Sequence, residues 1–260
     1  MPSLVHVEQA GGVFTITLDS PANRNALSSA LRAELLAALE TAAASPTARV
    51  VVLTATGTVF CSGMDLRENT TAATGSEGVR ELPEILQRIS GCPKPMIARV
   101  AGPARAGGIG LLAACDVVVA ADTAHFAFSE VRLGLIPAVI SVPVLRRICG
   151  PAGRELLLTG AVFDAYRARD IGLVNAVVEP DLVDAKVAEY VGQLLLGGPG
   201  ALAGTKAVLA AEYDDSDARY RALLNVSARQ FTGAEGREGG RAFLEKRPPE
   251  WVAQRQDSQR

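Results

Sequence analysis

The chain has 260 residues, 48% of them hydrophobic and 21% charged, and its 26 Lys and Arg against 28 Asp and Glu give a formal net charge of −2. A chain of this length can bury a sizeable core as one α/β domain or as two small domains. It has no basic excess that would neutralise a phosphate backbone, so nucleic acid is not an expected partner. Its 4 cysteines are widely separated and it has only 2 histidines, so we expect no metal site.

The amino-terminal segment and the apolar runs predict a soluble protein. The first twelve residues lack a charged region followed by an apolar one, so they do not resemble a signal peptide. The longest apolar stretches are interrupted by Asp116 or by Pro137 and Pro143, which makes a membrane span unexpected. Free, scattered cysteines suit a reducing compartment. We therefore expect a cytoplasmic protein that does not contact a membrane.

The first half of the chain carries strand and helix patterns in alternation. Residues 5–18 alternate apolar and polar side chains around Gly11-Gly12, which is typical of a β-hairpin. Ser28 is placed to cap a helix whose leucines follow one another at one-turn spacing from Leu27 to Leu39. Short apolar runs that predict buried strands lie at residues 49–54, 95–100 and 116–121.

Two further segments complete the pattern. Residues 67–78 are polar and rich in Gly and Thr, and they predict a loop that enters a helix around residues 82–89. After residue 180 the pattern becomes helical with little strand between the helices. The predicted helices lie at residues 182–196, 202–211, 219–231 and 235–245.

One glycine pattern suggests a dinucleotide site. Residues 108–113 satisfy G-x-G-x-x-A after a predicted strand, and Glu130 lies about where a ribose-binding acid belongs. Only six residues separate Gly110 from the next predicted strand at Val117, whereas a parallel crossover needs a dozen or more. The spacing therefore disfavours a dinucleotide site.

Two glycine-bearing turns, at residues 59–66 and 102–108, each follow a predicted strand. If both lie at the same end of adjacent strands, one peptide N–H from each could converge on a single oxygen and form an oxyanion hole. A helix that begins at Gly107 would strengthen the second donor through its dipole. The alternative is that Gly107, Gly108 and Gly110 only let a helix pack close to a strand.

Glu130 is a candidate proton carrier because its neighbours in residues 126–134 are mostly apolar, and burial raises the pKa of a carboxyl group. An ion pair with Arg132 or a solvated turn is the alternative, and this segment alone favours it. His125 lies five residues earlier on the same predicted strand, so it should face the other way. We expect Asp116 to be a structural acceptor and Cys61 to be a small buried residue.

Ordered motifs over nearly the whole chain resemble those of the crotonase superfamily of enoyl-CoA hydratases and isomerases. The motifs lie at residues 21–27, 60–66, 94–116, 126–137, 172–174, 235–236 and 242–247. The resemblance implies an α/β fold built as a spiral of β-β-α turns with a C-terminal helical region. It also implies a coenzyme A thioester as substrate, no separate cofactor, and assembly as a homotrimer or a dimer of trimers.

The resemblance divides the chain into an acyl-CoA-binding core over residues 1–195 and a helical trimerisation region over residues 196–260. It implies that the peptide N–H groups of Met64 and Gly107 hold the thioester oxygen and that Glu130 handles the proton at Cα. Residues implied to cradle the nucleotide end of coenzyme A are Ala22, Arg24, Ser62, Asp65 and Leu66. Phe243 and Lys246 fall where many members cover the coenzyme A of a neighbouring subunit. The Met64 side chain replaces a commoner alanine and would narrow the acyl pocket.

The chain departs from the two-carboxylate hydratases at Gly110, where these carry their first glutamate. Loss of that group removes the obvious water activator, and general-base help is typically about 10²–10⁴ in rate. Pro137 is followed by Ala138-Val139-Ile140 and not by the glycine-rich turn of many two-glutamate members. The motifs at residues 106–111 and 129–138 look most like those of bacterial hydratases of branched glutaconyl-type CoA esters. If this chain acts as they do, Glu130 alone would orient the water.

Three functions stay open at this point, and the first is preferred. The first is hydration of a 2-enoyl-CoA with a straight or branched acyl chain. The second is isomerisation of 3-enoyl-CoA to 2-enoyl-CoA with Glu130 as the single proton shuttle. The third is acyl-CoA binding without catalysis. We expect the acyl chain to be lined by the loop at residues 67–78, the helix that follows it, and residues 138–144.

Overall fold

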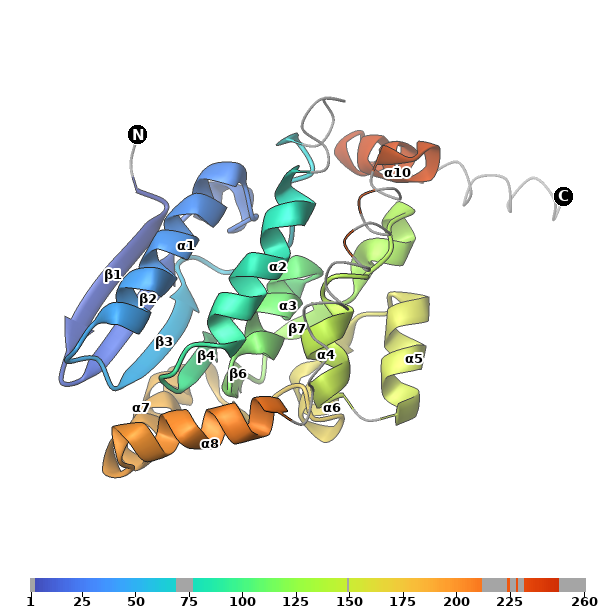
Figure 1. The fold of residues 1–260 in the computed structure, drawn as a ribbon. Coiled ribbons are helices and arrows are strands. Elements are labelled where there is room, and N and C mark those ends of the chain that lie inside the picture. The colour runs from blue at the N-terminus through green and yellow to red at the C-terminus, as the bar shows by residue number, and fades with distance from the viewer. Residues whose placement is uncertain are drawn as a thin grey trace, which may run out of the picture.

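The computed structural model describes residues 3–68, 77–148, 150–211, 224, 228 and 232–247. Its main sheet has six strands in the order β1-β2-β3-β4-β6-β9 (Figure 1). The strands are β1 (Val5–Ala10), β2 (Val13–Leu18), β3 (Val50–Ala55), β4 (Met96–Val100), β6 (Val117–Ala121) and β9 (Ala176–Val178). β1 and β2 form the predicted antiparallel hairpin, and every other pairing in this sheet is parallel.

A second, smaller sheet has three short strands in the order β5-β7-β8. These strands are β5 (Ala104–Arg105), β7 (His125–Ala127) and β8 (Phe163–Asp164). β5 pairs in parallel with β7, and β7 pairs antiparallel with β8. The sequence patterns did not predict β5, β8 or β9, because strands of two or three residues are too short to show periodicity.

Helices cover both faces of the main sheet. On one face α1 (Ser29–Ala44), α2 (Glu77–Ser90) and α3 (Gly107–Ala114) pack side by side over the larger hydrophobic core (Figure 1). On the other face α7 (Val183–Leu196) covers a smaller cluster formed mainly by valines of β3 and β6. The remaining helices are α4 (Ser141–Arg147), α5 (Gly150–Thr159), α6 (Ala165–Asp170), α8 (Pro199–Ala211) and α10 (Ala234–Leu244).

Most predicted elements are confirmed where the structure describes them, although α2 begins at Glu77, inside the predicted loop at residues 67–78. Ser28 caps α1 by accepting a hydrogen bond from the Leu31 N–H, and the leucines from Leu27 to Leu39 at one-turn spacing are all buried. Three of the predicted C-terminal helices are present as α7, α8 and α10. The predicted helix at 219–231 lies outside the described residues except for 224 and 228, and so do residues 69–76 of the predicted loop. Within the described part of the chain, no helix is both long and apolar enough to cross a membrane.

The spacing argument against a dinucleotide site is wrong. β4 and β6 are parallel neighbours joined by residues 101–116, which include α3, so this connection is long enough for a parallel crossover. The space around Gly108 and Gly110 shows what these glycines accommodate. A Cβ atom on Gly108 would overlap the Cys61 carbonyl oxygen, and one on Gly110 would lie 2.8 Å from Ile140 Cγ2. Both glycines make room for protein, which confirms the packing interpretation for these two positions.

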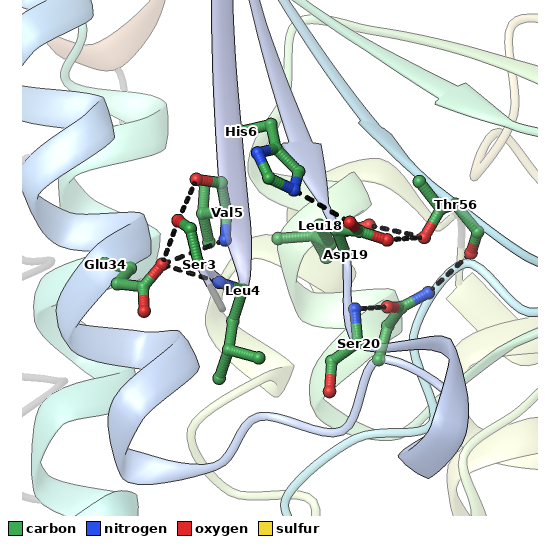
Figure 2. A network of polar contacts seen from close by, with 10 residues as sticks. Ser3, Leu4, Val5, His6, Leu18, Asp19, Ser20, Glu34 and Thr56 are labelled. Atoms are coloured by element: carbon green, nitrogen blue, oxygen red, sulfur yellow. Dashed lines mark hydrogen bonds and ion pairs between the residues drawn. The ribbon is translucent and has the colours of Figure 1, made fainter. Parts of the chain in front are cut away.

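Polar contacts anchor the start of the main sheet (Figure 2). One carboxylate oxygen of Glu34 on α1 accepts hydrogen bonds from the Ser3 hydroxyl and from the backbone N–H groups of Leu4 and Val5. At the same end of the hairpin, Asp19 contacts His6 of β1 and accepts a hydrogen bond from the Thr56 hydroxyl beyond β3. These hydrogen bonds, that from Thr56 most strongly, lower the pKa of the Asp19 carboxyl group.

Asn25 fixes the loop that follows β2. Its side chain is fully buried, and its Nδ2 donates to the Thr56 and Val59 carbonyl oxygens at 2.9 and 2.8 Å. Its Oδ1 accepts from the Ser20 N–H at 2.7 Å. The residue has a φ of 52°, in the left-handed region that asparagine tolerates better than most residues. Asn25 thereby ties the loop after β2 to the turn after β3.

Replacing Asn25 by Ala should lower the free energy of unfolding by about 1–3 kcal/mol, because three partly buried backbone groups lose their partner. Chemical denaturation of the variant would measure this loss. Asn25→Gly is the matched control, since it removes the same hydrogen bonds but relieves the positive φ. If the glycine variant recovered wild-type stability, the backbone conformation and not the hydrogen bonds would be the main contribution of Asn25.

Candidate functional site

A single pocket of about 740 Å³ contains every site residue that the sequence predicted. These residues are Ala22, Arg24, Ser62, Met64, Asp65, Leu66, Gly107, Glu130, Phe243 and Lys246. They come from the loop after β2, the turn after β3, the turn after β5, the short 3₁₀ helix η3 (Ser129–Leu133) and the end of α10. Five segments that are far apart in the sequence thus converge on one cavity, which makes it the leading candidate for a functional site.

Met64 and Gly107 present their peptide N–H groups in turns that lie against each other. The turns follow the adjacent parallel strands β3 and β4, as the sequence analysis expected. The Leu27 N–H donates to the Gly63 carbonyl at 2.8 Å, and the Arg105 N–H donates to the Cys61 carbonyl at 3.0 Å, so both turns are held. Among the described residues, neither the Met64 nor the Gly107 N–H has a hydrogen-bond acceptor. The two groups are therefore free to bind an oxygen.

The backbone before α3 is bent so that the Gly107 N–H is left free. Ala106 has a φ of 47°, which costs energy in a residue with a Cβ atom. Its N–H donates to the Ala127 carbonyl of β7 at 3.1 Å, and its own carbonyl accepts from the Ile109 N–H at 2.9 Å. Gly107 is the first residue of α3, so its N–H has no partner within the helix and carries the positive end of the helix dipole.

Glu130 is buried on η3 among apolar side chains. Its Oε2 is inaccessible to solvent and has no hydrogen-bond partner in the described structure. Burial raises the pKa of Glu130 to about 7, and a hydrogen bond from its own backbone N–H opposes this shift only in part. Near neutral pH the group is therefore present both as the acid and as the carboxylate, as a proton carrier must be.

The alternatives for Glu130 and its neighbours are resolved. Arg132 does not pair with Glu130, because its Nε donates to the Thr159 carbonyl at 3.1 Å. The expectation that His125 and Glu130 share a strand is wrong, since β7 ends at Ala127 and Glu130 lies on η3. The conclusion about His125 still holds, because its side chain is exposed and contacts only the Thr123 carbonyl among the described residues.

Among the described residues that line the pocket, Glu130 Oε2 is the one carboxyl oxygen without a hydrogen-bond partner. Among the described residues, Asp65 and Glu130 are the acidic ones that line the pocket. Asp65 is already engaged: its Oδ2 accepts from Asn23 Nδ2 at 3.3 Å and its Oδ1 from the Arg67 N–H at 3.0 Å. Gly110 is buried behind the wall, and Ile140 fills the space in front of it.

The residues that the resemblance assigns to the nucleotide end of coenzyme A all line the pocket. Ser62 holds the loop after β2, because its N–H donates to the Arg24 carbonyl at 3.1 Å and its hydroxyl to the Asn23 carbonyl at 3.4 Å. Arg24 itself adopts a φ of 61° and has an exposed side chain at the pocket. Arg105 also lines the pocket, although nothing in its local sequence pattern distinguishes it from a surface cation.

Much of the remaining wall is apolar, and only part of it lies in the segments predicted to line the acyl chain. Leu82 of α2 and residues 138–140 line the pocket, as expected. The other apolar residues of the wall are Ala26, Leu133, Leu135, Ile136, Pro137 and Leu244. A wall of this kind suits a hydrocarbon chain, because it offers few polar groups that an apolar ligand would leave unpaired.

Phe243 and Lys246 line the pocket of their own chain. The resemblance implied that they cover a ligand of the neighbouring subunit, and that expectation stays a prediction beside their place in the pocket of their own chain. α10 packs against η3, the element that carries Glu130.

Cys61 and Asp116 have the structural roles that we expected. Cys61 is fully buried, and burial raises its pKa to about 12, so the thiol stays protonated and is a poor nucleophile. Asp116 accepts a hydrogen bond from the Met96 N–H at 2.7 Å and pairs with Lys206 of α8. Among the described residues, no group of three or more His, Cys, Asp and Glu side chains is placed to hold a metal ion.

Comparison with known proteins identifies the family and agrees with the fold. The family model described as "Enoyl-CoA hydratase/isomerase" matches residues 8–254. A Thermus thermophilus protein with the provisional name of enoyl-CoA hydratase is 37% identical over 254 residues, which cover 95% of this chain and 99% of that protein. Enoyl-CoA hydratase EchA19 of Mycobacterium tuberculosis is 32% identical over 253 residues, with 94% of each chain covered.

A solved structure shows the same likeness in three dimensions. The crystal structure of an enoyl-CoA hydratase from Mycobacterium avium superimposes with a TM-score of 0.88 at 40% sequence identity. The match covers 96% of this chain and 100% of the other. The expected crotonase-like α/β fold is therefore confirmed.

The buried carboxyl group should make stability depend on pH with a defined sign. Because the pKa of Glu130 rises from 4.5 to about 7 on folding, the folded state binds the proton more tightly and loses stability as the pH rises from about 4.5 to about 7.

Glu130→Gln cannot ionise, so it should be more stable than the wild type at pH 8, by at most about 3 kcal/mol. The two proteins should be close at pH 5. Thermal unfolding across this range measures the difference. Glu34→Gln is the control whose difference from the wild type should stay constant between pH 5 and pH 8, because hydrogen bonds lower the pKa of Glu34 and the group titrates below this range. A pH-independent difference for Glu130→Gln would contradict the raised pKa.

Proposed function

The chain belongs to the enoyl-CoA hydratase/isomerase family of enzymes, and on this premise we propose that it adds water to the double bond of a 2-enoyl-CoA thioester with Glu130 as its single carboxyl group. One observation carries the proposal: the unpaired Glu130 carboxyl lines the same pocket as the two unpaired N–H groups of Met64 and Gly107. The names of the relatives support hydration as the reaction.

The two N–H groups account for the electronic part of the reaction. The thioester carbonyl oxygen accepts both hydrogen bonds, one from Met64 and one from Gly107. When a nucleophile adds to Cβ, the electrons of the double bond move to this oxygen and give an enolate. Donors that are already in position stabilise this charge without reorganisation, and in related oxyanion holes one such donor is worth about 10²–10³ in rate.

Glu130 accounts for both proton transfers. As a carboxylate it takes a proton from water while the water oxygen bonds to Cβ. As an acid it then returns a proton to Cα, and the enolate collapses to the thioester. The acyl chain gains the elements of one water molecule, and Glu130 ends in the state in which it began. The pKa of about 7 suits both steps, because neither protonation state is strongly favoured.

The loops around the pocket mouth are suited to the coenzyme A part of the substrate. Arg24 and Lys246 are cations placed where phosphate groups can pair with them. Ala22, Ser62, Asp65 and Leu66 line the same pocket as these cations and the oxyanion donors. Coenzyme A enters as part of the substrate, so this reaction needs no separate cofactor.

Other implications of the resemblance stay predictions. These are the branched glutaconyl-type acyl chain, the homotrimer or dimer of trimers, the division of the chain at residue 195, and a cytoplasmic location. Large apolar side chains that are exposed in the isolated chain support an oligomer, since such residues often lie in contacts between subunits. Leu158 and Leu196 are 76% and 89% exposed.

Glu130→Gln should reduce hydration of 2-enoyl-CoA at least about 10²-fold, because the amide can neither accept the water proton nor return it. Loss of the conjugated thioester absorbance measures the rate. In the wild type, kcat/KM should rise with pH through about 7, because the free enzyme must start as the carboxylate. Acyl-CoA binding to the variant should change little. A variant as active as the wild type would exclude Glu130 as the proton carrier, and binding without turnover of any enoyl-CoA would favour a non-catalytic role.

A second function, isomerisation of 3-enoyl-CoA to 2-enoyl-CoA, is favoured by the absence of a second unpaired carboxyl group from the described pocket wall. In this reaction Glu130 takes a proton from Cα of the 3-enoyl ester and returns it to Cγ, and no water is consumed. The apolar side chain of Ile140 in front of Gly110 suits such a reaction, because it offers water no hydrogen-bond partner.

A pair of variants should separate the two reactions. Gly110→Glu alone should destabilise the protein, because its Cβ would lie 2.8 Å from Ile140 Cγ2. Gly110→Glu with Ile140→Gly removes that overlap and should raise hydration of 2-enoyl-CoA about 10²-fold with little change in isomerisation of 3-enoyl-CoA. Ile140→Gly alone is the control. Wild-type protein that isomerises 3-enoyl-CoA but hydrates none of a panel of straight and branched 2-enoyl-CoAs would replace the first function by the second.

A further inference from the structure

Helix α10 contacts η3 backbone to backbone at Gly239. A Cβ atom on this buried residue would overlap the Leu133 carbonyl group and would lie 2.8 Å from Leu133 Cα. Because these are backbone atoms, no rotation of a side chain could relieve the overlap. The next residue differs: a Cβ on Gly240 would meet no atom within 4 Å. The requirement for glycine is therefore limited to one face of α10.

The neighbouring Glu238 ties the end of α10 to the residues that follow it. Its carboxylate is buried and accepts hydrogen bonds from Arg241 Nη2 at 2.5 Å and from Arg247 Nη1 at 2.6 Å. Arg247 lies beyond the end of the helix at Leu244, so this contact turns the chain back toward the helix. Lys246, in the same turn, has a φ of 53°.

These contacts set the positions of the pocket residues of α10. Phe243, Leu244 and Lys246 line the pocket within seven residues of Gly239. On the other side of the contact, Leu133 is the last residue of η3 and lines the pocket together with Glu130. One contact between Gly239 and Leu133 thus fixes the distance between the part of the wall that bears Glu130 and the part at the pocket mouth.

We propose that Gly239 and Glu238 are positioning residues that dock α10 on η3 and so close the pocket of the same subunit over its ligand. That this ligand is an acyl-CoA rests on the proposed function. Neither residue lines the pocket, so their effect passes through Phe243 and Lys246. Docking therefore contributes to the binding of the thioester and much less to the proton transfers at Glu130.

Gly239→Ala and Gly240→Ala form a matched pair that tests the docking. Both changes favour the helix itself by a similar amount, about 1 kcal/mol, because alanine is the better helix former. Only Gly239→Ala prevents the contact with Leu133. We expect it to raise KM for enoyl-CoA and Kd for coenzyme A at least about 10-fold, with kcat changed less than about 3-fold. Gly240→Ala should match the wild type in all three.

Hydrogen exchange of α10 gives a readout that does not depend on catalysis. In Gly239→Ala the amides of α10 should lose protection while those of β3 and β4 keep it, and in Gly240→Ala all should keep it. If the protein turned over no enoyl-CoA, the proposed function would fail while this comparison still tested the docking. Wild-type exchange, KM and Kd in Gly239→Ala would overturn the proposal.

Mixed assemblies test whether α10 closes its own pocket. Subunits with Gly239→Ala keep Glu130, and subunits with Glu130→Gln keep an intact α10, so co-expression combines the two defects in one oligomer. If α10 acts within its own subunit, the mixture should show only the raised KM. Activity with the wild-type KM would mean that the intact α10 covers the neighbouring pocket, and it would overturn closure within one subunit.

Discussion

Strands β3 and β4 pair in parallel, so the turns that follow them leave the sheet at the same edge and lie against each other. The contact is close because Gly108, in the first turn of α3, lies against the Cys61 carbonyl, where any side chain would overlap. The free N–H groups of Met64 and Gly107 depend on this arrangement. Two peptide groups from separate turns converge on one oxygen only while the strands and the helix hold both turns rigidly.

Burial of Glu130 suits this residue to proton transfer and at the same time lowers the stability of the folded protein. A carboxylate without a partner is unfavourable in apolar surroundings, and the protein lessens this cost by keeping the group protonated up to about pH 7. An ion pair would have stabilised the charge but would have lowered the pKa and weakened the group as a proton carrier. Arg132 is close in sequence and bonds to the Thr159 carbonyl instead. The site is thus less stable than it could be, as is common where function needs an unpaired group.

Glycines at three positions decide the shape of the pocket, because each lets another segment of the chain approach where a side chain would overlap it. Gly108 admits the turn after β3, Gly110 admits the Ile140 side chain, and Gly239 admits the backbone of η3. The second of these gives the pocket an apolar wall where a carboxylate could otherwise stand. The third brings the C-terminal helix onto the element that carries Glu130. Each contact joins segments that are more than twenty residues apart, so their effect on the site is purely tertiary.

The sequence by itself determined the hairpin, the long helices and the central strands, because periodic apolar side chains and the Ser28 cap are local signals. Its motifs also identified the polar and backbone groups proposed for the chemistry, and they showed the departure from the family pattern at Gly110. Strands as short as β5 and β8, the place of Arg105, and the separation of Glu130 from the strand of His125 have no local signal. Only the tertiary structure decided that Glu130 is unpaired, that Ile140 occupies the space before Gly110, and that α10 lies over its own pocket. These three features depend on which groups lie in contact in the folded chain although they are far apart in the sequence. Pairing, burial and steric overlap arise only from such contacts.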